Sequence, residues 1–121
     1  MTTPPMVLKL SAPAAAGEEY FLPSEKLIAG NPRQTVWKHY VNSSSKFFTG
    51  IWQSEPGKWS INYSEEEYCE ILQGTSVITD SAGHVVRVSA GERFVIPRGF
   101  VGTWEVLETT RKVYVICEPG A

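Results

Sequence analysis

The sequence is poor in three features that would point directly to a class of function: clustered basic residues, histidines and long apolar runs. Its 11 lysines and arginines are scattered against 13 aspartates and glutamates, which gives a formal net charge of -2, and its longest basic run is Arg111-Lys112. Because phosphate binding needs a clustered basic surface, we expect no nucleic-acid partner. No apolar run approaches the roughly 20 residues that a membrane-spanning helix needs, so we expect no membrane partner either.

The N-terminal segment lacks the uninterrupted apolar stretch of a secretory signal. Its apolar residues are broken up by Pro4, Pro5, Lys9 and Pro13. We therefore expect no signal peptide and a cytoplasmic protein. The length of 121 residues predicts one domain with a sizeable core, which we assign to 20–121. Residues 1–19 are expected to form an N-terminal arm that is either flexible or packed on a partner subunit.

The chain has two cysteines and two histidines, too few and too far apart for a zinc-finger pattern. Cys69 and Cys117 each lie inside an apolar run, so we expect two reduced core residues, with a disulfide between neighbouring strands as the alternative. His84 is expected to be a solvated turn residue, and His39 a surface or hydrogen-bonded strand residue.

What the sequence does contain is a series of short runs rich in β-branched and aromatic residues, separated by turn residues such as those of SEPGK, DSAGH and PRGF. No long amphipathic helix is evident. The pattern predicts an all-β, antiparallel fold, above all a jelly roll. The expected strands cover 35–41, 46–54, 58–64, 67–74, 75–80, 84–89, 93–97, 102–108 and 111–118.

Two of these segments carry paired motifs. In WSINYSEEEYCEILQG, Glu67 precedes Gly74, and GERFVIPRGFVGTWEV contains Gly91, Pro97 and Gly99. Glycine allows the positive backbone angles that tight turns need. In this order, joined by a hairpin over 75–90, the segments resemble the two motifs of the cupin superfamily. Over about residues 48–116 the chain is similar to the small cupins grouped with ureidoglycine aminohydrolase and the ethanolamine-utilisation cupin proteins. The resemblance implies an antiparallel jelly-roll β-barrel (cupin).

The resemblance also implies where a metal would be held and shows that most of its ligands are missing. A metal-binding cupin supplies two histidines and a glutamate from the first motif and a third histidine from the second. Glu67 matches the glutamate, and the third histidine falls on Gly102. The other two histidines fall on Ile61 and Tyr63, or on Ser60 and Asn62 in a register one residue longer.

With three of four ligands absent, we expect a degenerate metal site and no cofactor. A divalent metal held through unusual ligands such as Tyr63 or Cys69 stays open as an alternative.

Side chains alternate across a strand, so an inward Glu67, which the resemblance implies, fixes the direction of its neighbours. Cys69 and Ile71 then face the barrel interior, and Tyr68, Glu70 and Leu72 face away. Glu66 is expected to be solvated. Glu65 points inward only if the strand is already straight there, and the preceding turn favours a solvated Glu65.

On the same argument the predicted cavity is lined by Tyr63, Glu67, Cys69, Trp104 and Ile61, with Trp59 at its mouth, whereas Trp37 and Trp52 cannot be placed. A desolvated carboxylate calls for a partner that stabilises its charge. In the structural interpretation Tyr63 and Trp104 simply fill the barrel, and the Tyr63 hydroxyl donates to Glu67.

The functional interpretation is a small-molecule-binding cupin in which Glu67 and Tyr63 orient a polar or cationic group. The alternative is an enzyme, a hydrolase, lyase or isomerase of a small polar metabolite similar to ureidoglycine aminohydrolase, in which Glu67 is the catalytic acid or base and Tyr63 assists. A third possibility is a structural protein with a vestigial cavity. The resemblance also implies a homodimer, and the apolar runs at 7–10 and 20–22 could add to the sheet edge of a partner.

Overall fold

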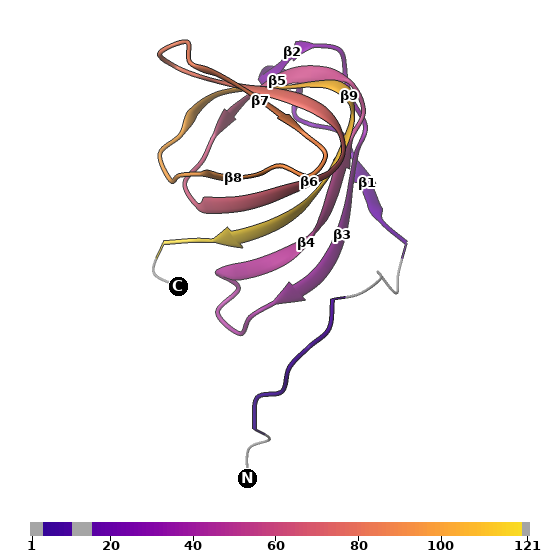
Figure 1. Cartoon of the computed structure of the whole chain (residues 1–121), viewed down its shortest axis with the longest axis vertical. Helices are drawn as coiled ribbons and strands as arrows, with labels where there is room; N and C mark the ends of the chain where they lie inside the picture. Colours follow the sequence, from indigo (N-terminus) through magenta and orange to yellow (C-terminus); the bar gives the residue numbers. More distant parts are fainter. Residues whose placement is uncertain (1–3, 11–15, 120–121) are drawn as a thin grey trace.

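The runs of β-branched and aromatic residues form antiparallel strands, as the sequence predicts. The structure, a computed structural model, describes residues 4–10 and 16–119. Within them the fold is all-β, with a single 3-10 turn, η1 (Ser24–Lys26), as its helical element. Figure 1 shows the strands curling round a common interior in the manner of a barrel. The strands are β1 (Glu18–Tyr20), β2 (Leu27–Ala29), β3 (Gln34–Val41), β4 (Phe47–Ser54), β5 (Gly57–Asn62), β6 (Glu66–Asp80), β7 (Val85–Ser89), β8 (Arg93–Ile96) and β9 (Val101–Cys117).

The sheet order is β1-β3-β4-β9-β5-β2, and β6 joins it through β9 while also pairing with β7 and β8. The predicted hairpin over 75–90 is confirmed, because β6 and β7 pair antiparallel from Thr75 opposite Ser89 to Thr79 opposite Val85. Its turn is fixed by Asp80, whose Oδ1 accepts from the backbone N–H of His84 at 2.9 Å. His84 lies exposed in this turn, as expected.

Two predictions of strand boundaries were wrong: β6 and β9 are each one long strand, where the sequence predicted two. Gly74 was read as the end of a strand, but it lies inside β6 with φ of 87°. A Cβ at this position would overlap the Thr109 carbonyl oxygen, so the glycine lets β9 approach closely. The register between β6 and β9 shifts between Ile71 and Ser76, and the strand bends there without ending.

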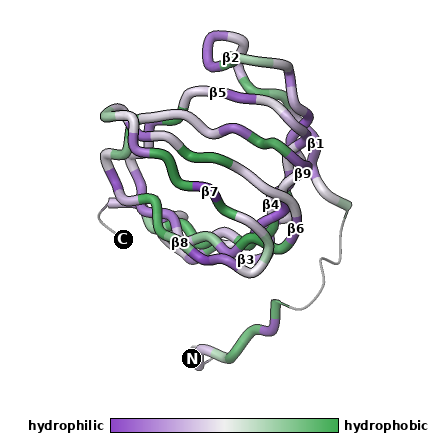
Figure 2. The backbone as a smooth tube through the Cα atoms, turned by 45° about the horizontal axis from the view of Figure 1, so that its top comes forward, coloured by the Kyte–Doolittle hydropathy of each residue, from purple (hydrophilic) through white to green (hydrophobic). Residues whose placement is uncertain are grey.

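The N-terminal region differs from its expectation in one respect. By sequence the apolar run at 20–22 could add to the sheet edge of a partner, but its first residue, Tyr20, ends β1, which pairs with β3 of the same chain, with Tyr20 opposite Gln34. The body of the domain therefore already includes Glu18. Residues 7–10 form no strand, and Figures 1 and 2 show this largely hydrophobic segment extending beyond the barrel. Part of the expected arm, 11–15, lies outside the described residues.

The core lies between the curled strands and follows their alternation. On β6, Glu67, Cys69 and Ile71 are all buried, whereas Leu72 is 48% exposed. The remaining buried apolar side chains come from β4, β5, β6, β7, β8 and β9: Trp52, Trp59, Ile61, Ile78, Val88, Ile96, Trp104, Val106 and Tyr114. Among the described residues, no helix is long and apolar enough to cross a membrane.

Both cysteines are free, so the alternative of a disulfide is not realised. Cys69 is fully buried, as expected, but the expectation that Cys117 lies in the core was wrong. Cys117 is the last residue of β9 and pairs with Phe47 and Glu66 at the end of the sheet, where its side chain is exposed.

Candidate ligand-binding cavity

A cavity of about 410 Å³ opens on the inner face of the curled sheet. Five of the six residues predicted from the sequence line it: Tyr63, Glu67, Trp104, Trp59 and Ile61. Cys69 lies behind the wall, fully buried and outside the lining. The other lining residues are Tyr20, Leu22, Lys26, Gln34, Val36, Lys38, Phe48, Trp52, Ser60, Asn62, Glu65, Lys112, Tyr114 and Ile116.

The centre of the cavity is a buried ion pair that the sequence did not predict. Lys112 Nζ lies 2.8 Å from Glu67 Oε2, and their side chains are only 6% and 4% exposed. Glu67 is held between two strands, opposite Ile96 of β8 and Ile116 of β9. The pair therefore joins the start of β6 to the C-terminal half of β9, and the desolvated carboxylate has the partner that it needs.

Two tryptophans surround the Lys112 ammonium. Nζ is 4.3 Å from the centroid of the Trp104 ring and 4.7 Å from that of Trp52. Trp52 is the direct cross-strand neighbour of Lys112 on β4, which explains the contact. The two rings meet edge to face with centroids 5.5 Å apart. Ring faces attract cations, so this arrangement stabilises the ammonium beyond what Glu67 supplies.

Three groups of this cluster, Lys112, Tyr63 and Cys69, keep their protons at neutral pH, because each has a raised pKa. Burial by itself lowers the pKa of Lys112, but the acidic groups around it, Cys69, Glu67 and Tyr63, outweigh this effect, and the pKa of Lys112 is raised. Burial is the largest influence on Tyr63, whose pKa it raises well above the usual value. It raises the pKa of the Cys69 thiol to about 12. Lys112 is thus a permanent cation, whereas Tyr63 and Cys69 are neutral.

Gln34 fixes the Trp52 ring over Lys112. Its Oε1 accepts from Trp52 Nε1 at 2.8 Å, and its Nε2 donates to Ser54 Oγ at 2.7 Å and to the Pro32 carbonyl at 3.3 Å. Gln34 is 1% exposed, and both its amide oxygen and its amide nitrogen are hydrogen-bonded to these neighbours. The Nε1 of Trp104, by contrast, is buried with no partner among the described residues.

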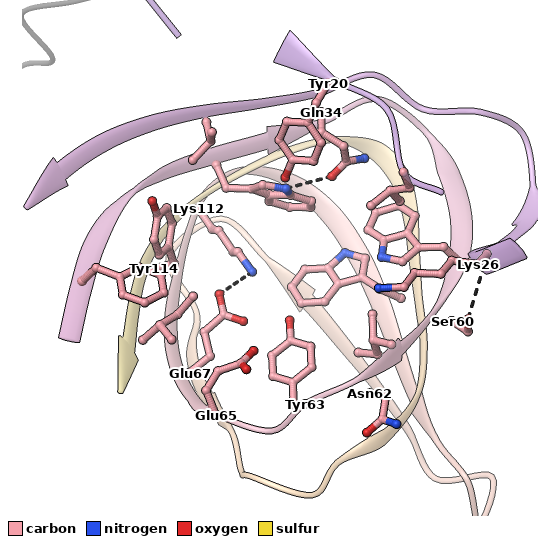
Figure 3. Close-up of a pocket in the computed structure, with 18 of the residues that line it drawn as sticks. Tyr20, Lys26, Gln34, Ser60, Asn62, Tyr63, Glu65, Glu67, Lys112 and Tyr114 are labelled. Atoms are coloured by element: carbon pink, nitrogen blue, oxygen red, sulfur yellow. Dashed lines mark hydrogen bonds and ion pairs between the residues drawn. The ribbon is translucent and has the colours of Figure 1, made fainter. Parts of the chain in front are cut away.

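The second of the two motif segments, 91–106, positions Tyr63. Its backbone N–H donates to the Phe100 carbonyl at 2.9 Å, and its carbonyl accepts from the Gly99 N–H at 2.7 Å. These bonds hold the residue that follows β5 against the Pro-x-Gly turn. Figure 3 shows the Tyr63 ring with its hydroxyl pointing into the cavity, toward the Lys112 and Glu67 pair.

The three consecutive carboxylates have three different environments. Glu67 is buried in the ion pair and Glu66 is exposed, both as expected. Glu65 differs from its expectation, because it is half-buried and lines the cavity. Figure 3 shows it beside Glu67, and its Oε2 accepts from Ser64 Oγ at 3.1 Å. Glu65 and Glu67 are two residues apart, and both line the cavity, although Glu65 lies in the bend that precedes β6.

The donors present do not fit a divalent metal. Within residues 4–10 and 16–119, no group of three or more His, Cys, Asp or Glu side chains comes together. Glu67 is already bound to an ammonium, and Cys69 and Tyr63 hold their protons up to alkaline pH, whereas metal ligation requires the deprotonated forms. A dication beside Glu67 would also be repelled by Lys112.

A second hollow, which we call the outer groove, lies on the opposite face of the same strands, with a volume of about 450 Å³. Trp37 lines this groove and therefore lies outside the barrel. His39 lines it as well, and its Nε2 is buried there without a hydrogen-bond partner among the described residues. The outer groove is lined by Leu10, Trp37, His39, Ile51, Leu72, Arg111 and Val113.

The sequence reasoning missed Lys112, Gln34 and Trp52. A signal for Lys112 was available, because alternation in RKVYVICE puts it on the same face as Tyr114 and Ile116. A lysine on the apolar face of a strand is a candidate partner for a buried carboxylate. No comparable signal identified Gln34, because its role depends on the pairing of β3 with β4.

The family model described as EutQ-like cupin domain matches residues 41–114, more than half of the chain. No curated protein matches the sequence. Among solved structures, a DUF861 family protein from Pseudomonas syringae has a TM-score of 0.78 at 19% identity, over 87% of this chain and 46% of the other. The EutQ protein of Clostridium difficile has a TM-score of 0.65 at 20% identity, over 84% and 82%. These two likenesses concern the fold alone.

A DUF861 protein from Thermotoga maritima is 33% identical over 53% of this chain and 73% of its own, with a TM-score of 0.52. The chain thus spans about half the length of the Pseudomonas protein and larger shares of the other two.

Proposed function

We propose that this chain, which belongs to the EutQ-like cupin domain family, binds a small polar molecule in the inner cavity, where Lys112 and Glu67 orient it. One observation carries the proposal: a buried ion pair with an O–N separation of 2.8 Å lies at an aromatic cavity of about 410 Å³. Ligand sites are typically concavities of about 300–1,000 Å³ with apolar walls and a few converging polar groups.

The composition of the walls supports binding over simple filling of the barrel. A stably folded β-barrel can pack its interior with aliphatic side chains, and buried charges add little or nothing to stability compared with such packing. Here the interior has kept two charges and a phenol that meet at an open space. Buried polar groups that converge on a cavity are functional candidates.

Binding is favoured over acid–base catalysis. A catalytic acid or base works best when its pKa lies near the working pH. Burial raises the pKa values of Tyr63 and Cys69 far from that range, and the pKa of Lys112 is raised as well. Glu67 is engaged by the ammonium. Groups that hold fixed protonation states are suited to orienting a ligand.

A thermal-shift screen of untagged protein tests the proposal with panels of small amines, ureides and sugars. We expect members of at least one panel to raise the unfolding temperature of the wild-type chain and to lose this effect in Glu67→Gln. The matched control is Glu66→Gln, which removes a neighbouring exposed carboxylate and should keep the shift. An absence of any shift, in all panels and at every pH tried, would contradict the proposal.

Elemental analysis of the same untagged protein tests the alternative of an unusual metal site. Because Glu67 is paired with Lys112 and few other ligands are near, we expect far less than one equivalent of any transition metal. A stoichiometric metal would instead favour an enzyme that holds a divalent metal through unusual ligands such as Tyr63 or Cys69.

A further inference from the structure

We infer that the cavity selects an uncharged ligand carrying a hydrogen-bond donor and an acceptor on neighbouring atoms, as in an amide or a diol, with Lys112 and Glu67 as the specificity-determining residues. This inference rests on the proposed function and deepens it. It narrows the ligand from polar or cationic to neutral and dipolar.

The ion pair has hydrogen-bonding capacity that its own contact does not use. An ammonium has three donors, and the contact with Glu67 Oε2 accounts for one of them. A carboxylate has about four acceptor sites, so Glu67 keeps acceptor capacity even with the Tyr63 hydroxyl and the Cys69 thiol beside it. A ligand at this place therefore meets a donor and an acceptor side by side. Figure 3 shows the Tyr63 hydroxyl directed toward the same point.

Lys112 and Glu67 cancel each other, so the cluster has no net charge to attract an ion. An anion drawn to Lys112 would lie against Glu67, and a cation drawn to Glu67 would lie against Lys112. Because both side chains are at most 6% exposed, water screens these repulsions poorly. A neutral group with a matching dipole avoids both of them.

The remaining charges of the lining do not alter this balance. Lys38 lies 3.5 Å from Glu18, and both side chains are more than two-thirds exposed. Lys26 is exposed and Glu65 is half-buried, and these two are of opposite sign. Charges in contact with solvent are strongly screened and interact only weakly with a ligand.

Cationic ligands are often held on the faces of tryptophans, but here the Lys112 ammonium already lies over Trp52 and Trp104 at 4.7 and 4.3 Å. The chain thus supplies its own cation to the aromatic site. The remaining walls, with Trp59 and Tyr63 among them, are left for the flat or apolar part of a ligand.

Three probes of nearly the same size and shape test the inference: benzamide, benzoate and benzylamine, which are neutral, anionic and cationic at pH 7. Binding of each to the wild-type chain is measured by isothermal titration calorimetry. We expect benzamide to bind at least about tenfold more tightly than either ion, since an unpaired charge in a buried site is costly. A wild-type chain that prefers benzoate or benzylamine would overturn the inference.

Two substitutions then shift the preference in opposite directions. Glu67→Gln leaves Lys112 as the sole central charge, and the ranking should change to favour benzoate by about tenfold. Lys112→Met leaves Glu67, and the ranking should change to favour benzylamine. Glu66→Gln, on the exposed neighbour, should keep the wild-type ranking. Unchanged rankings in both folded variants would overturn the role of the pair.

The near-ultraviolet circular dichroism of the tryptophans shows whether each variant is folded. If a variant is unfolded, the wild-type ranking and the other variant still decide the question. If the wild-type chain binds none of the three probes and no member of the thermal-shift panels, the proposed function fails, and this inference with it. If the chain binds but prefers an ion, only this inference fails.

Discussion

Arg111 and Lys112 are adjacent basic residues of β9 that face opposite sides of the same sheet. Arg111 lies in the outer groove, with its guanidinium 5.2 Å from the Trp37 ring centroid and its Nε donating to Gln53 Oε1 at 2.9 Å. Lys112 lies in the inner cavity over Trp52 and Trp104 and is paired with Glu67. Each cation has an aromatic neighbour and an oxygen acceptor.

The two sites differ in burial and in the charge of the acceptor. The half-buried arginine has a neutral amide as its partner, whereas the almost fully buried lysine has a carboxylate. A cation in contact with water gains little from pairing, but a cation buried without a counter-charge is strongly destabilising. A basic residue therefore contributes packing on one face of the sheet and, with its carboxylate partner, a permanent local dipole on the other.

The largest expected effect comes from making the same substitution at both positions. Lys112→Met leaves the Glu67 carboxylate buried without a counter-charge and should lower the free energy of unfolding by about 3–5 kcal/mol. Arg111→Met loses one hydrogen bond and one cation–π contact, for which we expect roughly 1–2 kcal/mol. Urea unfolding followed by tryptophan fluorescence measures both. Equal losses at the two positions would remove the distinction drawn between the two faces.

A double substitution tests whether the cost comes from the unpaired charge. Glu67→Gln should by itself be as damaging as Lys112→Met, because each leaves one buried charge. The double variant has none, and it should recover most of the stability, since a buried ion pair can often be replaced by neutral groups with little loss. Additive losses in the double-mutant cycle would mean that the pair is not the reason for the destabilisation.

A smaller effect is expected from alkaline pH. The pKa values of Lys112 and Tyr63 are raised in the folded chain, and that of Cys69 rises from 9.0 to about 12. A raised folded-state pKa gives stability that is fully present below the unfolded pKa and is lost as the pH rises toward the folded value. Stability should therefore be level with respect to these groups from pH 6 to 8 and fall above about pH 9.

For Cys69 alone the loss by pH 10 should be roughly 1–2 kcal/mol, read as the difference between unfolding free energies at pH 7 and pH 10. Cys69→Ala should reduce this difference, and Cys117→Ala, at the exposed cysteine, should leave it unchanged. An alkaline loss of the same size in both variants would show that other groups are responsible.

The smallest effect on stability, and the clearest on assembly, is expected in the outer groove. We propose that a second copy of the chain covers this face in a homodimer. Leu72, Ile51 and Val113 form an apolar surface there, and Leu10 of the N-terminal segment already contacts it. The preceding side chains of that segment are exposed, Met6 by 73%, Val7 by 94% and Leu8 by 59%. In the dimer, each copy would place these apolar side chains against the outer groove of the other copy.

Sedimentation velocity of wild type, Leu72→Glu and Leu107→Glu checks the dimer. Both leucines are exposed, by 48% and 41%, but only Leu72 lines the outer groove. We expect Leu72→Glu to be monomeric and Leu107→Glu to remain dimeric, with unfolding free energies within about 0.5 kcal/mol of wild type. A wild-type chain that is monomeric at all concentrations would contradict the homodimer.

Much of the fold followed from local patterns. The position of Glu67, together with the alternation of a strand, correctly turned Cys69 and Ile71 inward and Leu72 outward. The errors came at places where a local signal had two possible outcomes. A glycine such as Gly74 can end a strand, or it can let a continuous strand bend against a neighbour. The close approach of the Thr109 carbonyl shows that Gly74 has the second role. Tyr20 pairs within its own chain because β3 lies beside it.

The sequence by itself determined that the chain is all-β, that its two motifs are those of a cupin, and that most metal ligands are missing, because these properties reside in residue type and spacing. It also singled out Glu67 as the buried carboxylate. Only the tertiary structure decided what neutralises it. Lys112 is 45 positions away, and it reaches Glu67 because β6 and β9 are neighbours. Gln34, from a third strand, holds the Trp52 ring over the same ammonium. Contacts between distant strands depend on which strands become neighbours in the folded sheet, and the spacing of residues along the chain does not show this.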